Sequence, residues 1–443
     1  MRYIPHTSQD IEEMLTAVGV DSVNDLFAVI PDECRLDRAL DLPEPLNEWE
    51  LTANVQDLAA KNGTTAHGAS FLGAGCYDHY VPAVVKTLMS RAEFVTAYTP
   101  YQPESSQGTL QAIYEYQTLV ARLLGMDVAN ASMYDGASAL AEAVLMALRI
   151  KGGGVVAVSR AVQPQYRDVV ATYLEPGGFG VVELPVASDG RTDLSALSGI
   201  DKPAAVVVQS PNFFGCIEDL KAVARAAHKC DALCITSFTE PLAWGILKNP
   251  GGFGADIVCG EGRSFGLSRY GGGMSLGMFA AKREFVRSMP GRLVGKTVDR
   301  EGQRGFVLTL STREQHIRRE KATSNICSNQ SLCALGAAIY MACLGKTGIR
   351  ELARINVNKA AYLKDQLTSA GCEIPFSAPT FNEFIVRYPA VFDLAAHPDF
   401  TLGIPLGRWY PELADCHLVC ATETASKHTM DSLAGEVAAC RKR

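Results

Sequence analysis

The sequence lacks any uncharged stretch that approaches the roughly 20 apolar residues needed to span a bilayer. Its first residues, Met1-Arg-Tyr-Ile-Pro-His-Thr7, have no apolar segment of the kind found in signal peptides. We therefore expect a soluble, non-secreted, cytoplasmic protein. Long basic runs are missing too, and the net charge of −7 comes from acids and bases mixed along the chain. This balance argues against nucleic acid or membrane as partner and favours proteins and small molecules.

A disulfide framework is also missing. The 13 cysteines are an odd number, and most stand among apolar residues, as in Cys230-Asp-Ala-Leu-Cys234. A chain of 443 residues can bury a sizeable core without such bonds. Cys76 and His79 lie close in sequence, but no second pair follows at metal-ligand spacing, so a glycine turn is the preferred interpretation of that segment and no metal is expected. We expect reduced, buried thiols.

The pattern of apolar residues divides the chain into three expected regions: an N-terminal helical arm over 1–85, a large domain over 86–305 and a small α+β domain over 306–443. The arm holds two short amphipathic helices, near residues 9–18 and 48–60. A longer helix is predicted over 108–124. Short apolar strands then alternate with helical stretches, at 155–158, 181–184, 204–208, 233–236 and 256–258. This alternation predicts an α/β fold, a mostly parallel sheet sandwiched by helices.

Several segments could carry a binding site, each with an ordinary alternative. Asp135-Gly-Ala-Ser138 opens a helix and could receive a phosphate, but a plain N-cap is preferred. Glu240 follows a strand, where a turn residue is the preferred interpretation. Tyr98-Thr-Pro-Tyr-Gln-Pro-Glu104 is held rigid by two prolines and suits a binding surface and a structural loop equally. The charged run 312–321 is typical of a solvated surface, and the hydroxyls and amide of 322–326 could reach an anion.

The segment 255–266, followed by Gly271-Gly-Gly273, leads one to expect a lysine that binds pyridoxal phosphate (PLP), yet it carries Arg263. PLP enzymes need an amine that can lose its proton, and the arginine guanidinium holds its charge at any accessible pH. The pattern therefore resembles an enzyme scaffold without its reactive group, whose function depends on a partner.

Taken together, the segments 71–80, 98–104, 107–112, 127–132, 134–136 and 312–327 closely resemble subunit 1 of the two-subunit glycine dehydrogenase (decarboxylating), the P-protein of the glycine cleavage system. The resemblance runs from residue 1 to residue 413. One departure is visible, because the family usually has Gln-Ser-Leu-Gly where this chain has Arg263-Ser-Phe-Gly266. Neither version supplies a lysine, so the inference from Arg263 stands.

The resemblance implies a fold-type I PLP-dependent transferase architecture in an α2β2 heterotetramer. It implies that PLP is bound by the lysine of subunit 2, and that this chain binds none covalently and has no catalytic residue of its own. The assembly would decarboxylate glycine and pass the aminomethyl group to the lipoyl arm of H-protein.

Two sets of residues are candidate contributors to the partner's site. Tyr98, Tyr101 and Gln102 are expected to border the entrance for glycine or the lipoyl arm. Thr323, Ser324 and Asn325 are expected beside the partner's cofactor phosphate.

Two other functions stay open at this point. One is an autonomous PLP enzyme that uses a displaced lysine, such as Lys248, Lys282 or Lys296. The other is a structural or regulatory subunit with a vestigial cleft.

Overall fold

The structure is a computed structural model that describes residues 5–36, 38–62, 69–96, 98–326, 328–393, 397 and 399–440. The chain divides into two compact units, Met1–Thr64 and Thr65–Arg443, and each is described by itself. The domain boundaries expected at residues 85 and 305 stay predictions.

The first unit contains two helices whose starts are fixed by side chains. Helix α1 (Ser8–Val18) begins at Thr7 and helix α2 (Glu48–Ala60) begins at Asn47, and each start is a capping box. Neither helix has a buried residue. Large apolar side chains, Trp49 among them, are therefore exposed within this unit.

The second unit is built on a seven-stranded sheet with the order β2-β8-β7-β6-β5-β3-β4. Only β8 runs against its neighbours among these strands. The expected mostly parallel sheet is thus confirmed. The strands are β2 (Val128–Ala129), β3 (Val155–Ser159), β4 (Gly180–Leu184), β5 (Ala205–Gln209), β6 (Leu233–Phe238), β7 (Ile257–Glu261) and β8 (Gly277–Ala281).

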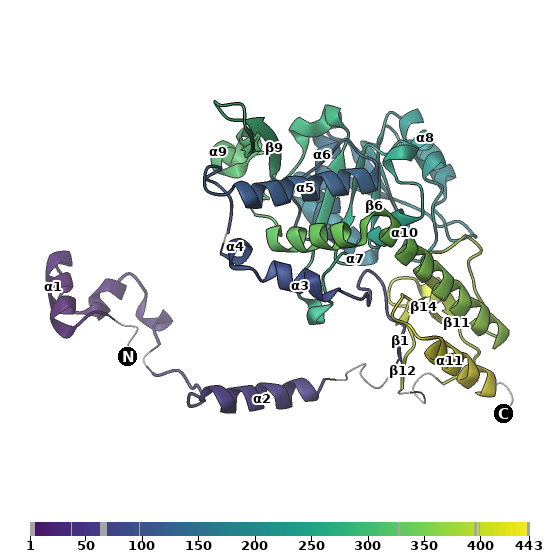
Figure 1. Cartoon of the computed structure of the whole chain (residues 1–443), viewed down its shortest axis with the longest axis horizontal. Helices are drawn as coiled ribbons and strands as arrows, with labels where there is room; N and C mark the ends of the chain where they lie inside the picture. Colours follow the sequence, from purple (N-terminus) through teal and green to yellow (C-terminus); the bar gives the residue numbers. More distant parts are fainter. Residues whose placement is uncertain are drawn as a thin grey trace. The chain divides into compact units, whose positions relative to one another are not determined.

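Helices cover both faces of this sheet (Figure 1). Alternate residues of a strand point to opposite faces, so Val206 and Val208 of β5 belong to one core and Val207 belongs to the other. The first core includes α5 (Gln107–Leu124), α8 (Leu220–Lys229) and the beginning of α10 (Ser331–Ser369). The second core includes α6 (Gly136–Lys151) and α7 (Pro164–Leu174). The helix predicted over 108–124 is α5, which ends at Gly125.

A hairpin of β9 (Leu293–Val298) and β10 (Arg304–Thr309) lies against α5. Two glutamine side chains of α5 bind the backbone of the hairpin, each with one donated and one accepted hydrogen bond, as a neighbouring strand would. The side chain of Gln117 donates to the Val294 carbonyl (3.0 Å) and accepts from the Val294 amide (2.9 Å), and Gln107 does the same with Phe306. This attachment fixes the start of β9, and with it Arg292. The short helices α3 (Ala83–Met89), α4 (Ala92–Val95) and α9 (Gln315–Arg318) complete the large part of the unit.

A smaller sheet, β11-β14-β13, forms near the end of the chain. Its strands are β11 (Glu383–Arg387), β13 (Ile404–Pro405) and β14 (Cys416–Cys420), with β1 (Ala69–Ser70) and β12 (Phe400–Thr401) paired nearby. Helix α11 (Lys427–Cys440) and the second half of α10 cover it. Figure 1 shows α10 passing from beside α5 to beside α11. By length and composition alone α10 could cross a membrane, but its first half is packed into the core at Ala334, Ala337 and Tyr340, and its backbone breaks at Gly345.

Candidate active-site cleft

The parallel strands β3, β5, β6 and β7 end side by side at one edge of the large sheet. Strand pairing places Gln209 of β5 opposite Ser237 of β6, and Phe238 of β6 opposite Gly260 of β7. Ligands of open parallel sheets bind at this carboxyl edge. The segments that follow these strands are therefore where an active-site cleft is expected. They include Gln163, Thr239, Glu240 and Arg263.

Arg263 lies two residues beyond β7 and is half-buried. Its Nη1 donates to the sulfur of Cys76 at 3.2 Å, and its Nη2 donates to the hydroxyl of Ser275. These two partners hold the guanidinium at the carboxyl edge. Because the guanidinium keeps its proton, this position has no group that could form an imine with an aldehyde cofactor.

The three lysines of the autonomous-enzyme hypothesis lie elsewhere. Lys282 pairs with Asp256, which precedes β7, so it lies at the opposite edge of the sheet. The amine of Lys248 lies over the ring of Phe253, 4.6 Å from its centre, in the connection that leads back to that opposite edge. Lys296 is an exposed residue of β9. None of the three reaches the end of β7.

Asp135 is the N-cap of α6, as the preferred interpretation predicted. Its side chain accepts a hydrogen bond from the Ser138 amide at 2.7 Å. The amide of Gly136 is also used, because it donates to Oε2 of Glu261 at 3.2 Å. The start of α6 thus faces a carboxylate of the protein itself.

A buried polar cluster lies where the segment 74–80 meets the end of β6 and the small sheet. The ring of His79 lies between two carboxylates, with Nε2 2.7 Å from Glu240 and Nδ1 2.8 Å from Glu423. Tyr77 donates to Glu383 at 2.8 Å, and its hydroxyl lies 2.9 Å from that of Thr239. No group of three or more metal-ligating side chains occurs among the described residues.

In this cluster the histidine and the two carboxylates favour each other's charged forms, whereas burial disfavours them. Although burial lowers it, the pKa of His79 is raised to about 10 by Glu240 and Glu423. The pKa of Glu423 is lowered to about 2, because hydrogen bonding and charge from His79 outweigh burial. Burial raises the pKa of Glu383 to about 7. The cluster therefore joins the 74–80 segment, the large sheet and the small sheet through an imidazolium ion. Besides His79, Glu240 accepts from the Leu242 amide at 3.0 Å, consistent with its expected place in a turn.

The loop with Tyr98, Tyr101 and Gln102 is exposed and is held from below by a buried arginine. Arg292 donates to the hydroxyl of Tyr101 at 3.1 Å, and its guanidinium carbon lies 5.4 Å from the centre of the Tyr101 ring. Arg292 also donates to Oδ1 of Asn329 at 3.3 Å. Arg292 thus supports Tyr101 in its exposed position.

Thr323, Ser324 and Asn325 come shortly before Ser328 and Asn329 in the sequence. Ser328 lies beside Tyr98 of this loop, and Asn329 accepts from Arg292, which supports the loop. The hydroxyl of Tyr98 lies 3.3 Å from that of Ser328. Asn325 is exposed, whereas Thr323 and Ser324 are half-buried beside Arg313. Arg313 itself donates to the carbonyls of Leu310, Met289 and Gly291. Both predicted sets therefore belong to one part of the fold, linked through Arg292, Ser328 and Asn329.

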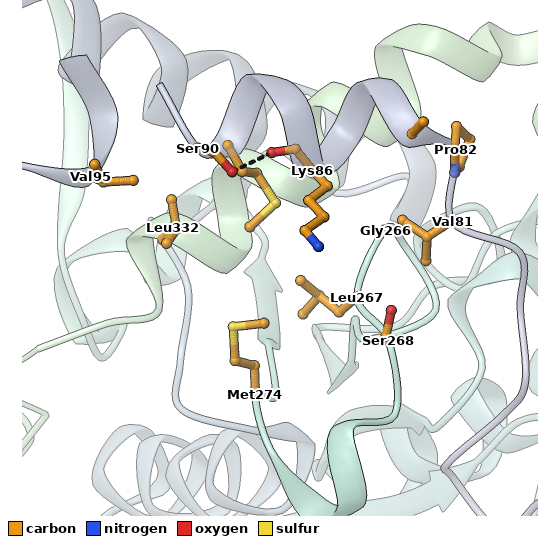
Figure 2. A pocket seen from close by; sticks show the side chains of 12 residues that line it. Val81, Pro82, Lys86, Ser90, Val95, Gly266, Leu267, Ser268, Met274 and Leu332 are labelled. Atoms are coloured by element: carbon orange, nitrogen blue, oxygen red, sulfur yellow. Dashed lines mark hydrogen bonds between the residues drawn. The ribbon is translucent and has the colours of Figure 1, made fainter. Parts of the chain in front are cut away.

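A cavity of about 400 Å³ opens between α3 and the chain that follows Arg263 (Figure 2). Most of its lining is apolar, and Lys86 is the only charged residue among the described residues that line it. In Figure 2 the Lys86 amine points into the space beside Leu267. A smaller cavity lined by Tyr98 shares Leu332 with it. We call this surface the α3 face and define it by Lys86, Val95, Tyr98, Met274 and Leu332. The four residues other than Lys86 are exposed large hydrophobic side chains.

Comparison with known proteins decides the family. A family model described as glycine cleavage system P-protein matches residues 1–435. The chain belongs to this family. Two similar curated proteins are named "Probable glycine dehydrogenase (decarboxylating) subunit 1". The protein from Desulfotalea psychrophila is 54% identical over 99% of this chain and 98% of its own length. The one from Geobacillus kaustophilus is 50% identical over 98% of each.

Solved structures agree with this assignment. A crystal structure of glycine decarboxylase (P-protein) of the glycine cleavage system, in inhibitor-bound form, has a TM-score of 0.89 and 47% identity and covers 99% of this chain and 100% of that one. A NifS-like protein has a TM-score of 0.62 at 13% identity, covering 85% of this chain and 99% of that one, and shows the fold alone. The expected fold-type I architecture is confirmed for this P-protein family member.

Sequence reasoning missed two features of this P-protein cleft. Glu261 belongs to the segment 255–266, which drew notice only for Arg263. The residues next to Glu261 in sequence do not indicate that its carboxyl group contacts the start of α6. The partners of His79 lie 161 and 344 residues away in sequence, so local patterns cannot connect them. The one available signal was the presence of isolated charged residues next to buried strands.

Proposed function

We propose that this chain acts as subunit 1 of a glycine decarboxylase of the glycine cleavage system. The naming of its relatives supports a second subunit as partner. Arg263 carries the proposal from the structure, because it places a permanent cation where the chemistry needs an amine. We infer that the homologous second subunit supplies the PLP lysine, in a cytoplasmic α2β2 heterotetramer that serves a lipoylated H-protein.

PLP on the partner would supply the electron-withdrawing ring that allows glycine to lose CO2. The residues of this chain orient and enclose the reactants. Tyr98 and Tyr101 present phenol groups from a loop fixed by two prolines and by Arg292. Such a preorganised surface binds with little loss of conformational entropy.

The α3 face supports docking of the second subunit at the same place. It carries exposed Val95, Met274 and Leu332 next to Tyr98. Exposed apolar patches of this kind mark protein contacts. A partner bound there brings its own active site next to Tyr98, Tyr101 and Gln102, and next to Asn325 if it also covers the 323–325 segment.

The test is reconstitution. Each subunit alone and both together are assayed for glycine–bicarbonate exchange, and borohydride reduction with peptide mapping locates the trapped PLP. We expect exchange only from the mixture, with PLP trapped on the second subunit. Trapped PLP on a lysine of this chain, together with exchange by this chain alone, contradicts the proposal.

The role of the loop is tested by replacing Tyr98, Tyr101 and Gln102 with alanine in the reconstituted complex. Because these groups would contact the reactants, we expect kcat/KM for glycine or for H-protein to fall by at least about tenfold, or about 1.4 kcal/mol. The matched control is Tyr173→Ala, which removes a tyrosine of α7 with a partly exposed ring. Unchanged kinetics in the triple variant would exclude the loop from the site.

A further inference from the structure

The start of α6 is the place where an α/β fold of this kind holds a phosphate, since free backbone amides and the positive end of the helix dipole point there. In this chain the place is taken by Glu261. The side chain is 5% exposed. Its Oε2 accepts from the Gly136 amide at 3.2 Å, and its Oε1 accepts from the amides of Arg263 (3.0 Å) and Leu276 (2.9 Å). Three backbone donors thus converge on one buried carboxyl group.

Gly136 is also packed closely on the side where a side chain would project. A Cβ atom added to Gly136 would lie 2.1 Å from the hydroxyl oxygen of Tyr166 and 2.8 Å from the amide nitrogen of Glu261. Tyr166 is a buried residue of α7. Gly136 therefore has no room for a side chain, and its amide is occupied by the Glu261 carboxyl group alone among the described contacts.

The rest of the carboxyl edge is covered by the segment 74–79. The side chain of Gln163 donates to the Ala74 carbonyl at 3.2 Å, and Arg263 donates to Cys76 at 3.2 Å. Farther along the edge, Tyr77 meets Thr239 and His79 meets Glu240. Four residues that follow β3, β6 and β7 therefore contact one internal segment.

We propose that the cofactor cleft of this chain is filled from within, with the Glu261 carboxylate in place of a cofactor phosphate and the 74–79 segment over the sheet edge in place of the cofactor ring. The cleft is closed to PLP for reasons that are independent of the missing lysine. This inference goes beyond the proposed function, because it holds whether or not a complex with a second subunit acts on glycine.

The first arm of the test uses the isolated full-length chain and inorganic phosphate as probe. Thermal midpoints of the wild type and of Glu261→Gly are measured against increasing phosphate, with chloride at equal ionic strength as control. We expect no shift for the wild type. The glycine variant, with three amides released, should gain a saturable rise of about 2 °C or more. A saturable rise in the wild type, or a folded glycine variant that gains none, overturns the assignment of Glu261.

The second arm remains decisive if the glycine variant does not fold. Arg263→Lys keeps Glu261 and the 74–79 segment and restores only an amine. We expect no PLP to be trapped at position 263 after borohydride reduction and peptide mapping, because the cleft is still filled. Trapping of PLP there at near-stoichiometric yield overturns the proposal. Neither arm uses glycine, the second subunit or H-protein, so its outcome is separate from that of the proposed function.

Discussion

Removal of the His79 imidazole tests the buried cluster that joins the large sheet to the small one. The side chain of His79 is 2% exposed, and its two carboxylate partners are nearly as buried. In His79→Ala, Glu240 and Glu423 lose the imidazolium and keep hydrogen bonds from uncharged donors, such as Asn382 at 3.2 Å and the Tyr80 amide at 2.7 Å. Breaking a buried ion pair in this way costs about 3–5 kcal/mol.

The pH dependence follows from the direction of the pKa shift. The folded pKa of His79 is about 10, above its ordinary value of 6.5. The folded protein therefore holds the proton more tightly than the unfolded chain. The stabilisation is complete below pH 6.5 and disappears as the pH rises through 10. A shift of this size corresponds to an upper limit of about 5 kcal/mol, in agreement with the mutational figure. Glu423, with a pKa of about 2, contributes above pH 4.5 and loses its contribution as the pH falls through 2.

Urea unfolding of the full-length chain, followed by circular dichroism at pH 6, 8 and 9.5, measures the effect. We expect His79→Ala to lose most stability at pH 6 and progressively less toward pH 9.5. His79→Gln should fall in between, since it keeps a hydrogen-bond donor without the charge. His316→Ala, at an exposed histidine, is the control and should stay within about 0.5 kcal/mol of the wild type. A loss below about 1 kcal/mol at pH 6, or a loss that does not change with pH, would refute an imidazolium in the cluster.

Two further predictions concern a buried acid and the first unit. Glu383 has a pKa raised to about 7, so the folded protein holds this proton more tightly and wild-type stability falls between pH 4.5 and 7. Glu383→Gln should remove up to about 3 kcal/mol of that fall in urea titrations, and an unchanged pH profile would contradict the shift. Replacing exposed Trp49 and Leu51 by serine should leave the thermal midpoint of the isolated chain within about 1 °C, since neither side chain is buried; a drop of several degrees by calorimetry would show that they are packed.

The core of the fold could be predicted because its strands are fully buried. Val206, Val207 and Val208 lie in an unbroken apolar run. Such runs between helices are typical of parallel strands that are buried on both faces. Strand β8 was missed because Gly277-Met-Phe-Ala-Ala281 lacks the β-branched residues that mark a strand. The hairpin of β9 and β10 was missed because Gly295 and Lys296 interrupt the apolar residues of β9. The hairpin is completed by Gln117 and Gln107, whose role depends on tertiary contacts.

The candidate site was predictable only where one residue type decides the chemistry. Arg263 stands out because no arginine can replace an amine in imine formation. Contacts between segments that are far apart in sequence cannot be recognised from any single residue type. Glu423 and His79 are joined across the fold, and Glu261 resembles any acid at the end of a strand until α6 is placed beside it.

The carboxyl group at the start of α6 also does for this helix what a bound phosphate would do. A buried helix start must satisfy its first amides, and a bound phosphate does so only while the ligand is present. In this chain Asp135 satisfies the Ser138 amide and Glu261 satisfies the Gly136 amide permanently. A ligand that binds only the folded state raises stability with the logarithm of its concentration above the Kd, so a cleft filled from within has a stability that does not depend on cofactor supply. We therefore expect the isolated chain to fold without PLP and without its partner.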